Sequence, residues 1–267
     1  MRNEELLRRV GYVETQNQDK EIIHGLSMET WRKVVKAIED SIPLYDQVND
    51  VISLGKAREA RSFALGRLAL KDGFCVLDGG IGPGVTSKLI LSAIKPSLLI
   101  GLDGSIKQLK TVRETLSPLW GDVVQVVRGS FEFLPFRDDT FDAITTCYAL
   151  RDSLDMSRSL GEYWRVCNRN GSFADVDIGK PESALTRAAS IFYVRCIMPF
   201  MAMFAIRGRI RGNPWKMIVP TYKSLPTNVE LLTMVKQRFP GVEFKQFLRG
   251  GIIVIIGRKS LRANGQE

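Results

Sequence analysis

The stretch FCVLDGGIGPG, residues 74–84, is the most informative part of this 267-residue chain. An apolar run typical of a buried strand passes directly into a turn that holds Gly80, Gly82 and Gly84. The segment SKLILSAI, which has the spacing of a helix, follows the turn. A strand, a glycine turn and a helix in this order predict the first unit of an open α/β sheet, where a ligand can lie against backbone without Cβ atoms.

The turn differs from two common phosphate-binding patterns. The dinucleotide fingerprint requires a third glycine where Val85 stands, and no Gly-Lys-Ser/Thr closes the turn as a P-loop would require. Asp103 ends the next apolar run, LLIGLD, about 20 residues past the turn, from where a carboxylate can accept hydrogen bonds from both ribose hydroxyls. The pattern therefore predicts a nucleoside-bearing ligand without a pyrophosphate, and S-adenosylmethionine meets this description.

Short apolar runs alternate with helical stretches through the rest of the chain. Five further strands are predicted at 123–127, 141–150, 172–178, 242–248 and 251–259. Arg249-Gly250 joins the last two as an antiparallel hairpin. We therefore expect an α/β fold with a doubly wound, Rossmann-like sheet of seven strands, mainly parallel with a C-terminal antiparallel hairpin, plus an N-terminal helical extension and a helical insert after strand five.

Four segments are expected along the chain. They are an N-terminal helical extension or lid (1–70), an S-adenosylmethionine-binding core (71–182), an apolar and basic insert that covers the substrate (183–229), and a C-terminal helix and hairpin that complete the sheet (230–267). Within the extension, helices are predicted at 28–42 and 53–70 from the spacing of apolar residues.

The insert begins with AASIFYVRCIMPFMAMFAI, residues 188–206, which Arg195 and Pro199 interrupt. A membrane-spanning helix needs about 20 continuous apolar residues, so none is assigned here. Two interpretations stay open: a buried helix pair that covers the sheet, or an apolar lid beside a basic rim that suits a lipid-like substrate or a membrane surface.

Charge and cysteine content narrow the class of protein. Lysine and arginine number 38 against 29 acidic residues, and the segment 183–229 holds no acid, which indicates either an anionic partner or a solvated basic face. Four scattered cysteines and the single histidine, His24, show no ligand spacing, so no metal site is predicted. Because the first ten residues also lack an apolar leader, a cytoplasmic location is expected.

Several blocks, in order, make the sequence similar to class I S-adenosylmethionine-dependent methyltransferases, and more narrowly to the ubiquinone/menaquinone biosynthesis C-methyltransferase family. They are YDQVNDVISLG (45–55), LDGGIGPG (77–84), GSFEFLPFRDDTFDAIT (129–145), YALRD (148–152), RVCNRNGSF (165–173) and RGGIIVIIGRK (249–259). This resemblance implies S-adenosyl-L-methionine as cofactor and C-methylation of a polyprenylated quinol, such as a demethylmenaquinol or a ubiquinol precursor, in quinone biosynthesis.

The resemblance also implies which residues form the site. Cofactor-binding roles fall on Asp78, Gly80, Gly82, Gly84, Asp103, Gly104, Ser130, Phe131 and Cys147, with Ser130 and Phe131 beside the adenine. Pro83 stands where the family usually has a threonine, and Cys147 where it usually has a serine.

The predicted catalytic residues are Arg151, Asp152 and Tyr45. A ring carbon becomes nucleophilic when the neighbouring hydroxyl loses its proton. Arg151 would hold the oxyanion, Asp152 would orient it or accept the proton, and Tyr45 would cover the cofactor. Ordinary structural roles stay open for two of them: a core tyrosine for Tyr45, and a helix N-cap for Asp152 or Ser153.

Other functions remain as alternatives at this point. The substrate could be another small molecule or lipid, and a cofactor-binding protein without activity is a further option. An RNA methyltransferase is disfavoured, because TTCYALRD replaces the Asn/Asp-Pro-Pro-Tyr type of motif and aromatic residues are not interleaved with the basic ones. Peripheral contact with an anionic membrane at its inner face, and a homodimer, stay open.

Overall fold

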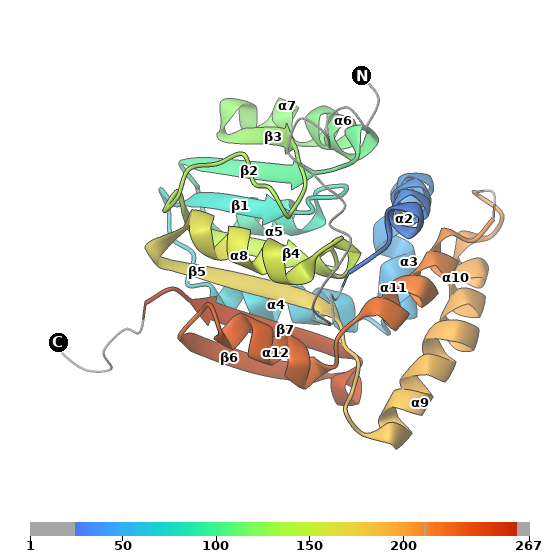
Figure 1. Cartoon of the computed structure of the whole chain (residues 1–267). Helices are drawn as coiled ribbons and strands as arrows, with labels where there is room; N and C mark the ends of the chain where they lie inside the picture. The colour runs from blue at the N-terminus through green and yellow to red at the C-terminus, as the bar shows by residue number, and fades with distance from the viewer. Residues whose placement is uncertain (1–24, 211, 261–267) are drawn as a thin grey trace.

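The computed structural model describes residues 25–210 and 212–260, and within them seven strands form one mixed sheet in the order β3-β2-β1-β4-β5-β7-β6 (Figure 1). The strands are β1 (Cys75–Gly79), β2 (Leu98–Asp103), β3 (Val124–Arg128), β4 (Phe141–Cys147), β5 (Cys167–Ile178), β6 (Gly241–Phe247) and β7 (Ile252–Arg258). Strands β1 to β5 run parallel, while β7 is antiparallel to both β5 and β6. The predicted fold class is confirmed.

The chain starts the sheet in its middle. From β1 it moves outward through β2 to β3, and then crosses back to place β4 on the other side of β1. This reversal leaves a crevice at the carboxyl ends of β1 and β4, which is where open α/β sheets bind ligands. The glycine turn after β1 lies at this crevice.

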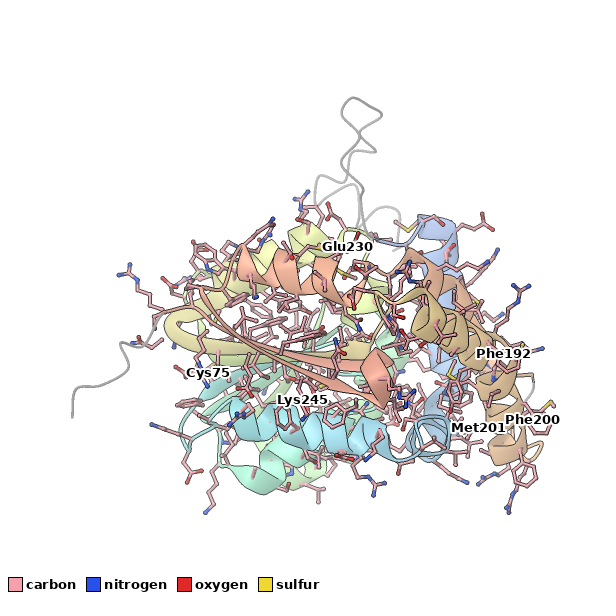
Figure 2. The ribbon with its side chains drawn as sticks, turned by 90° about the horizontal axis from the view of Figure 1, so that it is seen from below. Cys75, Phe192, Phe200, Met201, Glu230 and Lys245 are labelled. Carbon is pink, nitrogen blue, oxygen red and sulfur yellow. The ribbon has the colours of Figure 1, made fainter. Side chains whose placement is uncertain are left out.

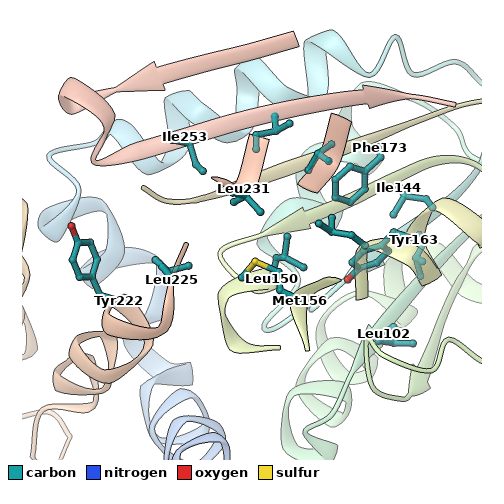
Figure 3. Close-up of a cluster of buried hydrophobic side chains, with 14 of the residues drawn as sticks. Leu102, Ile144, Leu150, Met156, Tyr163, Phe173, Tyr222, Leu225, Leu231 and Ile253 are labelled. Atoms are coloured by element: carbon teal, nitrogen blue, oxygen red, sulfur yellow. The ribbon is translucent and has the colours of Figure 1, made fainter. Parts of the chain in front are cut away.

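Helices cover both faces of the sheet (Figure 1). Helices α4 (Lys56–Arg67), α5 (Val85–Ala93), α6 (Ile106–Thr115) and the short α7 (Ser117–Trp120) follow one side, and α8 (Met156–Val166) and α12 (Asn228–Lys236) the other. Buried apolar side chains of the described residues form two clusters, which correspond to these two faces. Figure 3 shows part of one cluster, with Tyr163 and Phe173 labelled. The ring centroid of Phe173 lies 5.4 Å from that of Tyr163 and 5.3 Å from that of Phe239.

A third group of helices gathers at the end of the sheet toward which β1 and β2 point (Figure 1). It consists of α2 (Met28–Ser41), α3 (Tyr45–Ile52), α9 (Ala184–Phe192), α10 (Met198–Ile206) and α11 (Ile218–Ser224). Helix α2 begins where the sequence predicts it, because the Ser27 side chain accepts a hydrogen bond from the Thr30 backbone N–H. The sequence predictions of an N-terminal helical extension and a helical insert therefore both correspond to elements at the crevice.

The insert does not form the helix pair of the first interpretation. Residues Ala184–Ile206 form one continuous helix of 23 residues, with a wide π-type turn at Tyr193–Ile197 between α9 and α10. In this turn the Met198 N–H bonds to the Tyr193 carbonyl, five residues back, which accommodates Pro199 just beyond it. The interruptions at Arg195 and Pro199 therefore do not break the helix.

The continuous helix is also largely exposed, so the first of the two interpretations, a buried helix pair covering the sheet, is wrong. Only 28% of its most apolar window is buried, and its mean hydropathy is 1.8, so by length and composition alone it could cross a membrane. It packs against α3 rather than against the strands. Figure 2 shows it at one edge of the molecule, with Phe192 and Phe200 labelled on it.

Candidate active site

A cavity of about 440 Å³ lies beneath the helices at the end of the sheet. Most of its lining is apolar and comes from α2, α3, α9, α10 and α11, with Val34, Ile38, Val194, Met198 and Ile218 among the contributors. Four polar side chains that also line it, Tyr45, Tyr148, Arg151 and Asp152, are neighbours of one another. All three residues predicted to be catalytic thus face the same cavity.

Arg151 is held in place by a buried carboxylate. It lies in the short 3₁₀ turn Leu150–Asp152, which follows β4. Its Nη1 donates to Oδ1 of Asp177 on β5 at 2.8 Å, and its backbone N–H donates to Oδ2 of the same residue at 3.0 Å. Burial by itself would lower the pKa of Arg151, but the attraction of Asp177 and Asp152 raises it. The guanidinium therefore stays charged, and its Nε has no hydrogen-bond partner.

Asp152 combines burial with an adjacent cation. Its Oδ1 lies 3.7 Å from Arg151 Nε and makes no hydrogen bond. Burial raises the pKa of this carboxyl to about 7, because desolvation outweighs the attraction of Arg151. The group can therefore take up or release a proton near neutral pH, as a general acid or base must.

The proposed capping role of Asp152 or Ser153 is wrong. Helix α8 begins at Met156, and its N-cap is Asp155, whose side chain accepts a hydrogen bond from the Arg158 N–H at 2.9 Å. The start of α8 is also fixed by Glu132, which accepts hydrogen bonds from the Leu154 and Asp155 N–H groups. Asp152 is consequently left without a capping function.

Two tyrosines complete the polar part of the cavity. Burial raises the pKa of Tyr45, the first residue of α3, so its phenol remains a neutral donor. Tyr148 has a left-handed backbone with φ of 59°, and its buried hydroxyl has no hydrogen-bond partner. The Tyr148 ring lies 4.7 Å from the guanidinium carbon of Arg61 and 5.9 Å from that of Arg151. Strained backbone of this kind is common at functional sites.

The glycine turn has the conformation that its sequence predicts. Gly80, Gly82 and Gly84 all have positive φ, at 75°, 53° and 85°. A Cβ on Gly80 would meet Ala149 Cβ at 2.3 Å, so this glycine is required by packing. Next to Gly82 the nearest atom, the Gly80 carbonyl oxygen, is 4.0 Å from where a Cβ would stand, so a ligand can approach the backbone there.

Asp103 ends β2 beside this turn. Its Oδ2 accepts a hydrogen bond from the Gly82 N–H at 3.0 Å and its Oδ1 accepts one from the Ser105 N–H at 2.8 Å. Burial raises its pKa to about 6 although these N–H groups oppose the shift. Asp78, on β1 below the turn, likewise has a pKa raised by burial to about 6, and its Oδ2 accepts a hydrogen bond from the Ser87 hydroxyl.

The remaining predicted cofactor residues surround the same turn with varied contacts. The Ser130 hydroxyl donates to Glu132, and the Phe131 ring packs toward Gly80 and lies 6.1 Å from the ring of Tyr163. Gly104 faces the ring of Trp31 on α2.

Cys147, at the end of β4, carries a neutral thiol. Burial raises the pKa of this thiol to about 11, so it is not ionised near neutral pH. It lies 3.5 Å from the Thr145 hydroxyl oxygen. Its role beside the cofactor, like those of Ser130, Phe131 and Gly104, stays a prediction.

Four residues that sequence reasoning missed contribute to the site: Arg61, Trp31, Asp177 and Tyr148. Arg61 and Trp31 come from helices before β1, so no spacing in the sequence connects them with the turn. Asp177 could have been suspected from its place in ADVDI, an otherwise apolar strand. His24 lies outside the described residues.

The residues around the turn fit an adenosyl amino acid. Asp103 offers a carboxylate at the tip of β2, the backbone at Gly82 is approachable, and the Nε of buried Arg61 has no partner in the described structure. A phosphate-rich ligand fits less well, since two acids, the buried Asp78 and the half-buried Asp103, lie at this place.

A family model described as the ubiE/COQ5 methyltransferase family matches residues 27–259. The chain belongs to this family. Membership of the ubiE/COQ5 family confirms the predicted resemblance and the predicted class of enzyme, a methyltransferase.

Curated relatives in the ubiE/COQ5 family match along most of their length. The demethylmenaquinone methyltransferase of Lactiplantibacillus plantarum is 28% identical over 233 residues, which cover 85% of this chain and 97% of the relative. The ubiquinone/menaquinone biosynthesis C-methyltransferase UbiE of Marinomonas sp. is 30% identical over 237 residues, which cover 85% of this chain and 90% of the relative.

Solved structures share the fold at lower identity. A methyltransferase in complex with the Haloferax volcanii Trm112 activator superposes with a TM-score of 0.59 and 15% identity, covering 88% of this chain and 99% of that chain. The Haemonchus contortus phosphoethanolamine N-methyltransferase 2 in complex with S-adenosyl-L-methionine superposes with a TM-score of 0.55 and 16% identity, covering 71% of this chain and 38% of that chain. The likeness shows that this ubiE/COQ5 member has the methyltransferase fold.

Proposed function

We propose that this methyltransferase transfers a methyl group from S-adenosylmethionine to a ring carbon of a polyprenylated quinol in quinone biosynthesis. The observation that carries the proposal is the cavity of about 440 Å³, whose apolar walls enclose Arg151 and Asp152. Such a site suits an apolar molecule with an ionisable ring hydroxyl. The printed names of the curated relatives support the same class of substrate.

S-adenosylmethionine, when bound, supplies an electrophilic methyl group on its sulfonium. The protein therefore has to align the acceptor and exclude water. Asp103 holds the ribose hydroxyls, Gly82 leaves room for the ligand at the turn, and Asp78 faces the methionyl ammonium group. Ser130, Phe131, Gly104 and Cys147 border the adenosyl moiety.

Activation of the acceptor falls to the residues after β4. Asp152 accepts the proton of the ring hydroxyl, which its pKa of about 7 allows near neutral pH. Arg151, fixed by Asp177, stabilises the oxyanion that this proton transfer leaves. After the methyl group has joined the ring carbon, that carbon loses its own hydrogen as a proton and the ring oxygen is reprotonated, which restores the quinol. Tyr45 closes the cavity from α3 and donates a hydrogen bond as a neutral phenol.

The isoprenoid tail leaves the cavity toward the exposed helix Ala184–Ile206. Leu185 and Leu248 line the cavity and are also 81% and 44% exposed, so the cavity opens between them. Within the described residues, the helices of 25–70 and of 183–229 act as lids over the 71–182 core, and residues 230–260 complete the sheet.

The same helix contacts the membrane that holds the substrate. Phe192, Phe200 and Phe204 on it are 59%, 66% and 70% exposed. Figure 2 labels Phe192 and Phe200 on this helix. Arg195 and Arg207 are exposed beside them, in a segment without acids. Aromatic side chains next to arginines suit the surface of an anionic bilayer, so the protein is cytoplasmic and binds peripherally at the inner face of the membrane.

The decisive experiment is mass spectrometry of quinones from cells that lack this protein. A quinone one methyl group lighter than normal should accumulate, and the wild-type gene should restore the normal species. The purified protein should also transfer a labelled methyl group from S-adenosylmethionine to a demethylated quinol in detergent micelles. Unchanged quinones, with label appearing in another lipid or in RNA, would refute the proposal.

A further inference from the structure

Arg61 is a buried cation that the proposed reaction does not yet explain. Its side chain projects from α4 and the residue is only 5% exposed. Its Nε has no hydrogen-bond partner, and no ion pair or hydrogen bond to this guanidinium occurs within residues 25–210 and 212–260. Buried charges in proteins are nearly always paired, so an unpaired one requires an explanation.

The neighbours of Arg61 place its charge beside the glycine turn. Its guanidinium carbon lies 4.7 Å from the centroid of the Tyr148 ring, directly after β4. It is also close enough to Asp78, on β1, to oppose the rise of the Asp78 pKa that burial causes. Since Asp78 and Thr145 are paired residues of β1 and β4, Arg61 lies where these two strands meet the glycine turn.

The ring of Tyr148 satisfies only part of the guanidinium. A cation–π contact uses one face of the group, whereas its five N–H donors lie in the plane and point outward. A planar anion that accepts two parallel hydrogen bonds would complete the arrangement, and a carboxylate has this geometry.

We propose that Arg61 binds the α-carboxylate of the amino-acid part of the methyl donor, while Asp78 faces its α-ammonium group. This inference deepens the proposed function and rests on its donor, S-adenosylmethionine. An α-amino acid carries one anion and one cation on adjacent atoms, and Arg61 and Asp78 offer the two complementary charges at the turn. A phosphate is the poorer match, because Asp78 would repel it.

The test compares two ligands that differ in one group. Calorimetry measures binding of S-adenosylmethionine and of decarboxylated S-adenosylmethionine, which keeps the sulfonium, the amine and the adenosine. The wild-type protein should bind the decarboxylated compound about tenfold or more weakly. Arg61→Met should lower the affinity for S-adenosylmethionine by a similar factor. The affinity of this variant for the decarboxylated compound should stay within about twofold of the wild-type value.

Stability separates a binding role from a structural one. Removing an unpaired buried charge should leave the unfolding temperature of the ligand-free protein unchanged or higher, and reduce the rise that S-adenosylmethionine causes. Arg58→Met is the matched control, because Arg58 lies on the same helix, is exposed and pairs with Asp50. This control should bind both ligands as the wild type does.

The outcomes are distinct. If the wild type binds both ligands equally, or if Arg61→Met weakens both equally, Arg61 does not recognise the carboxylate. If the wild type does not bind S-adenosylmethionine, both the assignment of this compound as the methyl donor and the inference about Arg61 are refuted. If the binding pattern is as expected but no quinol is methylated, the proposed acceptor fails while the role of Arg61 stands.

Discussion

At Asp152 two opposing effects act on one carboxyl group, and burial outweighs the adjacent Arg151. If Asp152 accepts the proton of the substrate, turnover should rise with pH through about 7, because only the ionised carboxylate can act as a base. Asp152→Asn should lower turnover by about 10²–10⁴-fold and abolish this pH dependence. A pH–rate profile of both proteins provides the measurement, and an unchanged profile in the variant would remove Asp152 from the mechanism.

The ion pair of Arg151 with Asp177 predicts a large effect on stability. Arg151→Met leaves the Asp177 carboxylate, which is 1% exposed, without its cation. We expect the free energy of unfolding to fall by about 3–5 kcal/mol, measured by urea denaturation. Adding Asp177→Asn should recover part of this loss without restoring turnover. If the double variant also recovers activity, Arg151 acts only through structure.

The carboxylate of Asp103 predicts a change in cofactor binding. Asp103→Ala should weaken the binding of S-adenosylmethionine by about 1–3 kcal/mol, because the ribose hydroxyls and the Gly82 N–H lose a hydrogen-bond acceptor. Asp122→Ala is a suitable control, since Asp122 lies before β3, at the opposite end of that strand from Arg128, the residue that pairs with Asp103. Calorimetry with unchanged affinity in Asp103→Ala would contradict the assigned cofactor site.

At the scale of residues, the sequence predicts part of the site and misses the rest for a physical reason. Tyr45, Arg151 and Asp152 belong to short blocks with a recognisable order, and they face one cavity. Arg61 and Trp31 reach the crevice only because helices before β1 fold back over it. Such neighbours depend on tertiary packing, which no local spacing encodes.

At the scale of elements, strands are the best-predicted part of the chain. All seven lie where the sequence predicts them. The parallel strands β1 to β5 carry largely uninterrupted apolar runs because they are buried, whereas β6, antiparallel and at the edge of the sheet, mixes apolar and polar residues. Helix Ala184–Ile206 is the exception, since Arg195 and Pro199 look like interruptions in the sequence. A wide turn absorbs the proline, and the exposure of the helix depends on what lies opposite it in the folded chain.

This helix carries a prediction about membranes. The protein should sediment with vesicles of anionic lipid, less so at high salt because salt screens the arginines. Phe200→Ser together with Phe204→Ser should weaken vesicle binding by about tenfold or more, since both rings are exposed and available for burial. Leu119→Ser, at an equally exposed leucine on α7, is the control. If the wild type, the double phenylalanine variant and the Leu119→Ser control sediment equally, the helix only covers the cavity and does not bind the membrane.

At the scale of the whole molecule, buried acids link stability to pH. The pKa of Asp152 rises from its ordinary value of 3.8 to about 7 on folding, and those of Asp78 and Asp103 rise to about 6. Between these values the unfolded chain has lost protons that the folded protein keeps. The contribution of each group to stability is therefore fully present below pH about 4 and is lost as the pH rises toward 7.

Thermal unfolding of the ligand-free protein tests this linkage. Asp152→Asn does not titrate, so its stability relative to wild type should increase between pH 4 and pH 8 by about 2–4 kcal/mol. A constant difference between wild type and Asp152→Asn would mean that Asp152 is ionised in the folded protein at all these pH values.

The wide turn at Tyr193–Ile197 holds one residue more than an ordinary helical turn. Deleting a single residue from it would restore regular winding and rotate α10 about its own axis by about 100° relative to α9. Phe200 and Phe204 would then no longer lie on the same face of the helix as Phe192, and different side chains of α10 would contact α3. Which side chains lie on the outer face of this helix thus depends on the number of residues in the wide turn as much as on their identity. A deletion in the turn would rotate α10, the second half of the helix, relative to α9.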